Sequence, residues 1–345
     1  MARVTTHDIA KAAGVSQSTV SIILNNSNKA SISEDTRNRV LKVAEELGYA
    51  PKSAEKKVRG LKNVIAVVVP NLMYPYYPRL IECIEKHAIA RGYSILACNI
   101  DSRESEDYYT ELFLQNGVDG IVFAFTPNTD HIVNAIKGKI PAVVLGEKDD
   151  LINLDTIALN SMAAGNILVD HLFSLGHRHI GFISNPSEAV SRATRRRLEG
   201  VRVRMEQLNI RENLVHVYND SYSDIDTLED CIASSLELTK KLIAENPKIT
   251  AIITPDDITC IGVIEALRQT GRKIPEDMAL CSFDDTDISK ILYPNVTTID
   301  HGNQIRSKFA IDLLVERIMN QGKSGRIYKT ESEPNLVIRE STVKK

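Results

Sequence analysis

The sequence contains no tryptophan, only 5% aromatic residues and few cysteines. The cysteines are scattered, odd in number and without a C-x-x-C pair, which argues against a disulfide framework and against a zinc site. There is no run of 18 apolar residues, so we expect no transmembrane helix. Glycine-rich phosphate loops, nucleophile motifs and clusters of metal ligands are also missing, and we therefore expect neither an enzyme nor a bound cofactor or metal. The five cysteines are Cys83, Cys98, Cys231, Cys260 and Cys281.

The remaining composition is that of an ordinary soluble globular protein, with 43% hydrophobic and 25% charged residues. The polar N-terminus lacks the apolar segment of a signal peptide, which predicts a cytoplasmic protein. Charge is unevenly distributed: residues 1–62 hold 11 lysines and arginines against 6 acids, whereas the remainder has 8 more acids than bases. A basic segment on an acidic body suits a phosphate-binding module attached to a domain that does not bind nucleic acid.

Two short helical patterns meet at Gly14 near the N-terminus. Ile9 and Ala13 share one face of the first pattern, and Val20 and Ile23 share one face of the second. Gly14 allows a sharp turn, and Ser16 stands where an N-cap is wanted for the second helix. Two helices joined in this way predict a helix-turn-helix, although a helical hairpin that only packs would show the same pattern.

A third helix is predicted to complete this segment. Ser33 is a suitable N-cap for it, Val40 and Ala44 supply its apolar face, and Gly48 ends it. If the hairpin is a helix-turn-helix, its second helix enters a DNA major groove and presents a polar outer face to base edges. That face carries Ser16, Gln17, Ser18, Ser21 and Ile22.

These residues resemble the headpiece of the lactose-repressor/galactose-repressor (LacI/GalR) family of bacterial transcription regulators. The resemblance implies sequence-specific DNA binding by Thr5, Ser16, Gln17, Ser18, Thr19, Ser21, Ile22 and Asn25. Many relatives have arginine at Ile22, so we expect an altered operator sequence at that step, with isoleucine reading a thymine methyl. The matching run is Val4-Thr5-x-x-Asp8-Ile9-Ala10-x-x-Ala13-Gly14-Val15-Ser16-x-Ser18-Thr19-Val20-Ser21-x-x-Leu24-Asn25, followed by Leu47-Gly48-Tyr49-x-Pro51.

Residues 51–62 form a polar, basic linker that could be a flexible tether. The resemblance implies instead a hinge helix that folds on DNA and pushes an apolar side chain into the minor groove. Val58 occupies the position of the family's leucine wedge. Because valine is smaller and Glu55 brings a carboxylate close to phosphates, we expect a weaker wedge here.

From Val64 onward the pattern alternates between strands and helices. This alternation predicts an α/β fold with two doubly wound parallel sheets in succession. The predicted strands are 64–69, 93–97, 119–123 and 142–145, then 180–183, 215–217, 251–253 and 278–282. Predicted helices end near 91, contain 111–114 and 132–136, and later cover 162–175, 189–208, 226–245 and 258–270.

The resemblance extends over this region and implies a core like that of periplasmic sugar-binding proteins. Such a chain crosses three times between two lobes, here near 160, 290 and 320. The implied organisation is a headpiece (1–50), a hinge (51–62) and an effector-binding core (63–345), with an N-lobe (63–160 and 292–321) and a C-lobe (161–291 and 322–345).

Ligands of parallel sheets bind beyond the carboxyl ends of the strands, and aromatic and charged residues follow several strands here. Tyr74 and Tyr76 could stack on a ligand or could pack a domain edge. The family motif implies a ligand role for Arg197, whose rigid fork suits hydroxyls, carboxylates or phosphates. It implies the same for Asp256 and Asp284, with Asn160 as a further candidate. Asp257 is expected to cap the following helix, and Arg195 and Arg196 to be solvated.

An arginine, two carboxylates and tyrosines suit a polyhydroxylated ligand such as a sugar or sugar derivative; a nucleobase, nucleoside or sugar phosphate is the alternative. Paired carboxylates could also hydrolyse a glycoside, but no other catalytic motif accompanies them. We therefore interpret the chain as a transcription regulator, most simply a repressor, that binds a pseudo-palindromic operator as a homodimer. No heptad repeat follows the closing strand near 335–339, which favours a dimer over a tetramer. A small-molecule-binding protein without DNA function and a regulator controlled by a protein partner are the alternatives.

Overall fold

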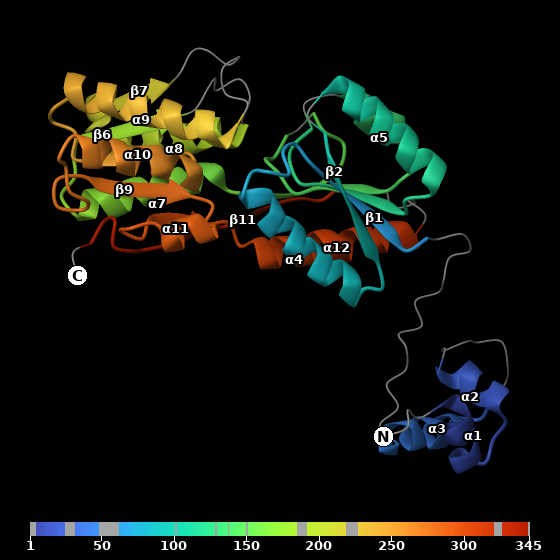
Figure 1. Ribbon diagram of the computed structural model, residues 1–345. Coiled ribbons are helices and arrows are strands. Elements are labelled where there is room, and N and C mark those ends of the chain that lie inside the picture. Colours follow the sequence, from blue (N-terminus) through green and yellow to red (C-terminus); the bar gives the residue numbers. More distant parts are fainter. Residues whose placement is uncertain are drawn as a thin grey trace. The chain divides into compact units, whose positions relative to one another are not determined.

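A computed structural model describes residues 5–24, 32–47, 62–100, 102–127, 130–136, 138–149, 151–184, 192–218, 227–320 and 326–343. The chain divides into two units, residues 1–60 and residues 61–345, which we describe separately (Figure 1). Asn25 and Val58, to which DNA contacts were assigned, lie outside the described residues, as does most of the predicted hinge.

The first unit contains three helices, α1 (Thr6–Ala13), α2 (Gln17–Leu24) and α3 (Glu34–Glu46). Gly14 ends α1 with a φ of 64°, the left-handed conformation that glycine adopts without strain. Ser16 Oγ accepts a hydrogen bond from Thr19 N at 3.1 Å and so caps α2, as predicted. The three helices pack around a small apolar core formed by Ile9, Ala10, Ala13, Val20, Ile23, Val40 and Ala44.

The second unit consists of two lobes, each a six-stranded sheet between helices. In the N-lobe sheet the order is β11-β5-β4-β3-β1-β2, and every neighbouring pair is parallel. Helices α4 and α12 cover one face, and α5 and α6 the other (Figure 1). Helices on both faces explain why β1 is a continuous apolar run. The strands are β1 (Val64–Val69), β2 (Ser94–Asn99), β3 (Gly120–Phe123), β4 (Ala142–Val144), β5 (Asp155–Leu159) and β11 (Lys329–Ser332); the helices are α4 (Tyr76–Ala90), α5 (Arg103–Asn116), α6 (Asp130–Ile136) and α12 (Asn303–Met319).

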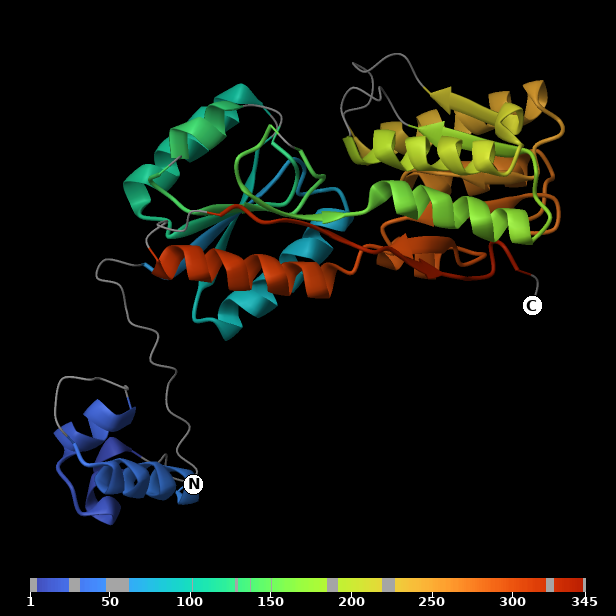
Figure 2. The same ribbon diagram turned by 180° about the vertical axis from the view of Figure 1, so that it is seen from behind.

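The C-lobe sheet has the order β12-β10-β9-β8-β6-β7, with β12 antiparallel to β10 and the other neighbours parallel. Helices α7 and α8 pack on one face, and α9 and α10 on the other (Figure 2). The strands are β6 (Ile180–Ser184), β7 (Leu214–Tyr218), β8 (Ala251–Ile253), β9 (Ala279–Phe283), β10 (Thr297–Asp300) and β12 (Asn335–Val337); the helices are α7 (Ser161–Ser174), α8 (Arg192–Gln207), the 3₁₀ turn η1 (Arg211–Asn213), α9 (Leu228–Glu245), α10 (Asp257–Gln269) and α11 (Asp287–Ile291).

The structure moves two of the three expected crossings. The first follows β5, near residue 160 as expected, because β5 pairs in the N-lobe sheet and α7 packs in the C-lobe. The second was expected near 290, but β10 pairs with β9, so the chain leaves the C-lobe only after Asp300. The third was expected near 320, but β11 pairs with β5 in the N-lobe and β12 with β10 in the C-lobe, so it falls between Ser332 and Asn335 (Figure 2).

Candidate functional site

The N-terminal end of α2 presents a polar, solvent-exposed surface. Ser16, Gln17 and Ser18 are all exposed. Ser16 Oγ lies 2.7 Å from Ser18 Oγ and 2.8 Å from Thr19 Oγ1, so these hydroxyls form one hydrogen-bonded group. Gln17 Nε2 donates to Thr6 Oγ1 at 3.0 Å, which ties the start of α2 to α1. Exposed hydroxyl and amide groups of this kind can donate to and accept from base edges or phosphates.

The remaining predicted DNA contacts differ in exposure. Ser21 is exposed and Ile22 is half-buried. Thr5 is the N-cap of α1 and shares a capping box with Asp8: Thr5 Oγ1 donates to the Asp8 carboxylate at 2.7 Å and accepts from Asp8 N at 3.4 Å. The side chain of Thr5 therefore has a structural role in the headpiece in addition to any contact with DNA.

In the second unit, Arg197 is the centre of a buried polar cluster between the two sheets. It is 7% exposed, and its guanidinium donates to Pro255 O at 2.5 Å and to Asp284 Oδ1 at 3.2 Å. A further contact of 3.1 Å joins Arg197 Nη2 to His301 Nε2. The guanidinium also lies over the Phe283 ring, 4.6 Å from its centroid. These contacts hold the charged group in one orientation.

Two glycines place Arg197 by allowing α7 and α8 to approach closely. A Cβ on Gly165 would lie 2.3 Å from Arg197 O, and one on Gly200 would lie 2.1 Å from Met162 O. No larger residue fits at either contact without moving a helix. The backbone of Arg197 is therefore fixed by the packing of these two helices.

Asp284 occupies the carboxyl end of β9 and is 8% exposed. Its φ of 99° is a strained conformation for a residue other than glycine, and such residues concentrate at functional sites. Burial raises the pKa of Asp284 to about 7 against the opposite influence of Arg197. The cluster therefore contains a carboxyl group that changes its charge near neutral pH.

Tyrosines from the N-lobe face this cluster. Burial raises the pKa of Tyr74 well above its ordinary value, and the neighbouring Asp256 and Asp284 raise it further. The ring of Tyr76 lies 5.3 Å from that of His301. The structure thus brings together five of the six predicted effector contacts: Tyr74, Tyr76, Arg197, Asp256 and Asp284.

The sixth candidate, Asn160, lies at the start of α7. Its side-chain oxygen accepts from Ala163 N at 3.1 Å and caps α7. The helix cap that we expected at Asp257 is made by Asp256 instead. Asp256 caps α10, because its carboxylate accepts from Thr259 N at 2.8 Å, whereas Asp257 is buried and accepts from Thr286 N at 2.7 Å. The residue expected to cap the helix is therefore a buried link between the ends of β8 and β9.

Sequence reasoning overlooked His301 and Arg306. His301 is 3% exposed, and burial beside Arg197 lowers its pKa well below the ordinary value, so its imidazole is neutral. Arg306, 2% exposed, lies in the first turn of α12. Both residues follow β10, a strand that we did not predict; recognising Thr297–Asp300 as a strand would have directed attention to its carboxyl end.

Ion pairs also connect the lobes. Arg196, which we expected to be solvated, lies 3.5 Å from Glu147 Oε2 and 3.3 Å from Glu331 Oε1. Arg192 pairs with Asp149 in the same region. Since the arginines belong to α8 and the acids to the N-lobe, these contacts favour the relative position of the lobes seen here.

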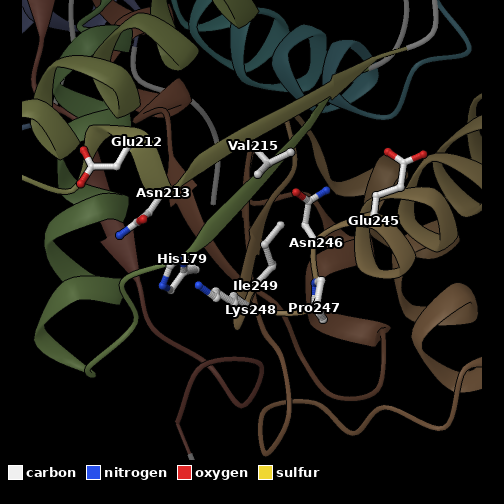
Figure 3. A pocket seen from close by; sticks show the side chains of 9 residues that line it. All are labelled: His179, Glu212, Asn213, Val215, Glu245, Asn246, Pro247, Lys248 and Ile249. Atoms are coloured by element: carbon white, nitrogen blue, oxygen red, sulfur yellow. The ribbon is translucent and has the colours of Figure 1, made fainter.

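Two surface depressions are lined by residues other than Arg197 and Asp284. One, of about 370 Å³, is lined by residues such as His179, Glu212 and Lys248 at the amino ends of β6, β7 and β8 (Figure 3). Ligands of parallel sheets bind at the opposite ends of the strands, so this depression is a poor effector site. The other, of about 330 Å³, lies between α4 and α11 and includes Arg79 and Asp287.

Other kinds of site receive no support from the described part of the chain. Its residues contain no group of three or more histidine, cysteine, aspartate or glutamate side chains arranged to hold a metal ion. None of its helices is both long and apolar enough to span a membrane.

Two family descriptions match this chain. Residues 5–52 match "Bacterial regulatory proteins, lacI family", and residues 169–342 match "Periplasmic binding protein-like domain". The first match contains the three helices of the headpiece, and the second covers most of the C-lobe, α12 and the closing strands.

Similar proteins match over nearly the whole length. The HTH-type transcriptional regulator DegA of Bacillus subtilis is 30% identical over 99% of this chain and 98% of its own. The HTH-type transcriptional repressor PurR of Haemophilus influenzae is 29% identical over 98% of both chains. A periplasmic binding protein/LacI transcriptional regulator from Alkaliphilus metalliredigens, solved in complex with D-xylulofuranose, has a TM-score of 0.70 and 27% identity, covering 81% of this chain and 99% of its own.

Proposed function

Because this chain belongs to the lacI family of bacterial regulatory proteins and is a DNA-binding transcriptional repressor with a small-molecule-binding core, we propose that its effector is a carbohydrate or carbohydrate derivative bound at the Arg197 cluster. The observation that carries this proposal is the buried Arg197–Asp284 pair beside Tyr74 and Tyr76. The residues come from both lobes, so a ligand there contacts both. The D-xylulofuranose complex of a relative supports the ligand class.

The chemistry of the cluster suits hydroxyl groups. Carboxylates such as Asp256 and Asp284 accept from hydroxyls, the Arg197 fork donates to them, and tyrosine rings stack on the apolar faces of sugar rings. A nucleobase would use the same aromatic faces but needs fewer carboxylate acceptors. Since none of these groups is accompanied by a catalytic motif, we propose binding without chemical conversion of the ligand.

We propose that DNA is read by Ser16, Gln17, Ser18, Thr19, Ser21 and Ile22 at the exposed face of α2, with Thr5, Asn25 and Val58 as further contacts. A homodimer places one headpiece on each half of a pseudo-palindromic operator in the cytoplasm. Effector binding changes the angle between the lobes and, through it, operator affinity. The coupling is reciprocal, so operator DNA must change effector affinity by the same factor.

Exposed apolar residues support the dimer. Ile89 and Leu96, on α4 and the edge strand β2, are 62% and 38% exposed, and Ile291 and Tyr293 beside α11 are 78% and 87% exposed. We propose that these residues lie in the interface, because a second copy would cover both the apolar side chains and the open edge of the N-lobe sheet. Light scattering should show a dimer for the wild type and a shift towards monomer for Tyr293→Asp.

The effector proposal is tested with the full chain and the DNA upstream of its gene. Fluorescence anisotropy measures operator affinity with and without members of a panel of sugars, sugar derivatives and nucleosides. At least one carbohydrate should change operator affinity, and Arg197→Ala and Asp284→Ala should lose that response while binding the operator like the ligand-free wild type. The exposed Arg195→Ala is the matched control. A response to nucleosides alone, or normal responses in both variants, would contradict the proposed site.

A further inference from the structure

Arg306 is a buried cation that has no carboxylate partner among the residues that the structure describes. Three arginines of the described chain are less than 9% exposed: Arg197, Arg306 and Arg317. Arg197 pairs with Asp284 at 3.2 Å, and Arg317 pairs with Asp155 through two bonds of 2.7 and 2.9 Å. Arg306, the most buried of the three, forms no ion pair with any described residue.

The hydrogen bonds of Arg306 are weak substitutes for an ion pair. Its Nη2 donates to Ile157 O at 3.2 Å, and its Nη1 lies 3.4 Å from Tyr76 Oη and 3.5 Å from Asn303 Oδ1. Its Nε has no hydrogen-bond partner among the described residues, and the same holds for Arg197 Nε and Arg317 Nη1, so the missing acid is what sets Arg306 apart. Charge-assisted bonds normally measure about 2.7–2.9 Å, so the two Nη1 contacts are at the limit of hydrogen bonding. A buried guanidinium held only by neutral acceptors is unfavourable unless another group compensates its charge.

Arg306 adjoins the Arg197 cluster through Tyr76. The Tyr76 hydroxyl contacts Arg306, and its ring lies beside His301, which in turn contacts Arg197. Arg306 also lies in the first turn of α12, whose N-cap Gly302 supplies no side-chain acceptor. The positive end of this 17-residue helix adds to the charge of the guanidinium, and the nearest acid to it in sequence, Asp300, is already engaged, accepting from Gly302 N at 2.9 Å.

We propose that Arg306 binds an anionic group of the effector, a carboxylate or a phosphate, so that the effector is a sugar acid or a sugar phosphate rather than a neutral sugar. This inference rests on the proposed carbohydrate effector and extends it. Arg197, Asp256 and Asp284 bind the hydroxyls, and the anionic group compensates the charge of Arg306. Both candidate anions present the paired oxygens that a guanidinium fork recognises.

The test measures binding of matched neutral and anionic sugars to the full-length protein by isothermal titration calorimetry. The probes are D-glucose, D-glucuronate and glucose 6-phosphate, together with D-ribose and ribose 5-phosphate, each at constant ionic strength. We expect an anionic member to bind about ten- to a hundredfold more tightly than its neutral parent, the range for one charge-assisted hydrogen bond. Preference for the uronate or for the phosphates identifies which anion the site takes.

Arg306→Met keeps much of the side-chain volume and removes the charge. It should abolish the preference for the anionic sugar, whereas the exposed Arg268→Met on α10 should retain it. The melting temperature of ligand-free Arg306→Met should equal or exceed that of the wild type, because an uncompensated buried cation has been removed. If Arg306 only anchors the Ile157 carbonyl, the melting temperature falls instead and the preference persists.

The outcomes separate this inference from the proposed function. If neutral sugars bind the wild type as tightly as their anionic counterparts, or Arg306→Met keeps the anion preference, the inference is wrong and the carbohydrate proposal stands. If nucleosides bind and no carbohydrate of either kind does, both are wrong. The wild-type comparison decides between neutral and anionic sugars even if Arg306→Met does not fold.

Discussion

Replacing Arg197 by alanine tests how the buried cluster between the lobes is held together. The substitution removes the donors to Pro255 O and His301 Nε2 and leaves the Asp284 carboxyl group, 8% exposed, without its cation. Breaking a buried ion pair by removing one partner typically costs about 3–5 kcal/mol, since the remaining charge is uncompensated.

Protonation of Asp284 limits this cost. Its pKa is already about 7, and loss of Arg197 raises it further, so the carboxyl group becomes neutral near pH 7 instead of remaining charged. We therefore expect a loss at the lower end of the range, about 3 kcal/mol, equivalent to a fall in melting temperature of about 6 °C for a core of this size. The double variant Arg197→Ala/Asp284→Ala leaves no orphaned partner and should lose about 2 kcal/mol less than the sum of the two single variants.

Thermal unfolding followed by tyrosine fluorescence is a suitable assay. The chain has no tryptophan, and 10 of its 11 tyrosines lie in residues 61–345, so the signal reports on the core rather than on the headpiece. Arg195→Ala, an exposed neighbour on the same helix, should change stability by less than about 0.5 kcal/mol. Single-variant losses that add to within about 0.5 kcal/mol would refute the coupling between Arg197 and Asp284.

Three further predictions concern Asp284, Gly14 and Arg196. Between about pH 4 and 7 the Asp284 carboxyl group holds a proton in the folded protein and releases it in the unfolded chain. The free energy of unfolding, measured by urea titration, should therefore fall as pH rises through this window, and Asp284→Asn should flatten that slope. Gly14→Ala should destabilise the headpiece by about 1–2 kcal/mol, because the φ of 64° strains any residue with a Cβ, while no described atom within 4 Å would clash with that Cβ. Hydrogen exchange of the α1 amides measures this loss, and unchanged protection would contradict the account. Arg196→Ala should lower the free energy of unfolding of the core by about 1–3 kcal/mol, because the buried Glu147 Oε2 accepts no hydrogen bond and would lose the cation that compensates its charge. Arg195→Ala is the control, and equal stabilities of the two variants would mean that the contact contributes nothing.

Local signals in the sequence predicted much of the headpiece and most strands of the core. Gly14 and Ser16 act within one turn of where they stand, through backbone conformation and a single hydrogen bond, so their roles can be recognised without the fold. Strands such as β1 are apolar throughout, because helices cover both faces of the sheet. The strand β11, Lys-Thr-Glu-Ser, has no such signal and exists because it pairs with the edge of β5.

The misplaced crossings had consequences for the site. The crossings that the resemblance implied near 290 and 320 come before β10 and β11, two strands that we did not predict, and neither His301 nor Arg306 was among the predicted site residues. The helix cap expected at Asp257 is likewise made by its neighbour Asp256. Either aspartate could cap a helix by local chemistry. Asp257 does not, because its carboxylate accepts hydrogen bonds from Ser282 on β9 and from Thr286 just after that strand.

By itself, the sequence determined the α/β fold class and the three N-terminal helices, because strand and helix patterns depend on periodicity and on caps that act over a few residues, and its resemblance to a known family supplied the DNA-binding role. Only the tertiary structure decided which charges have partners. Arg196 joins the lobes and Arg197 is paired with Asp284, whereas Arg306, the same residue type, is buried with no acid beside it in the part of the chain that the structure describes. Electrostatic interactions and desolvation depend on distances between segments far apart in the chain, and the fold sets those distances.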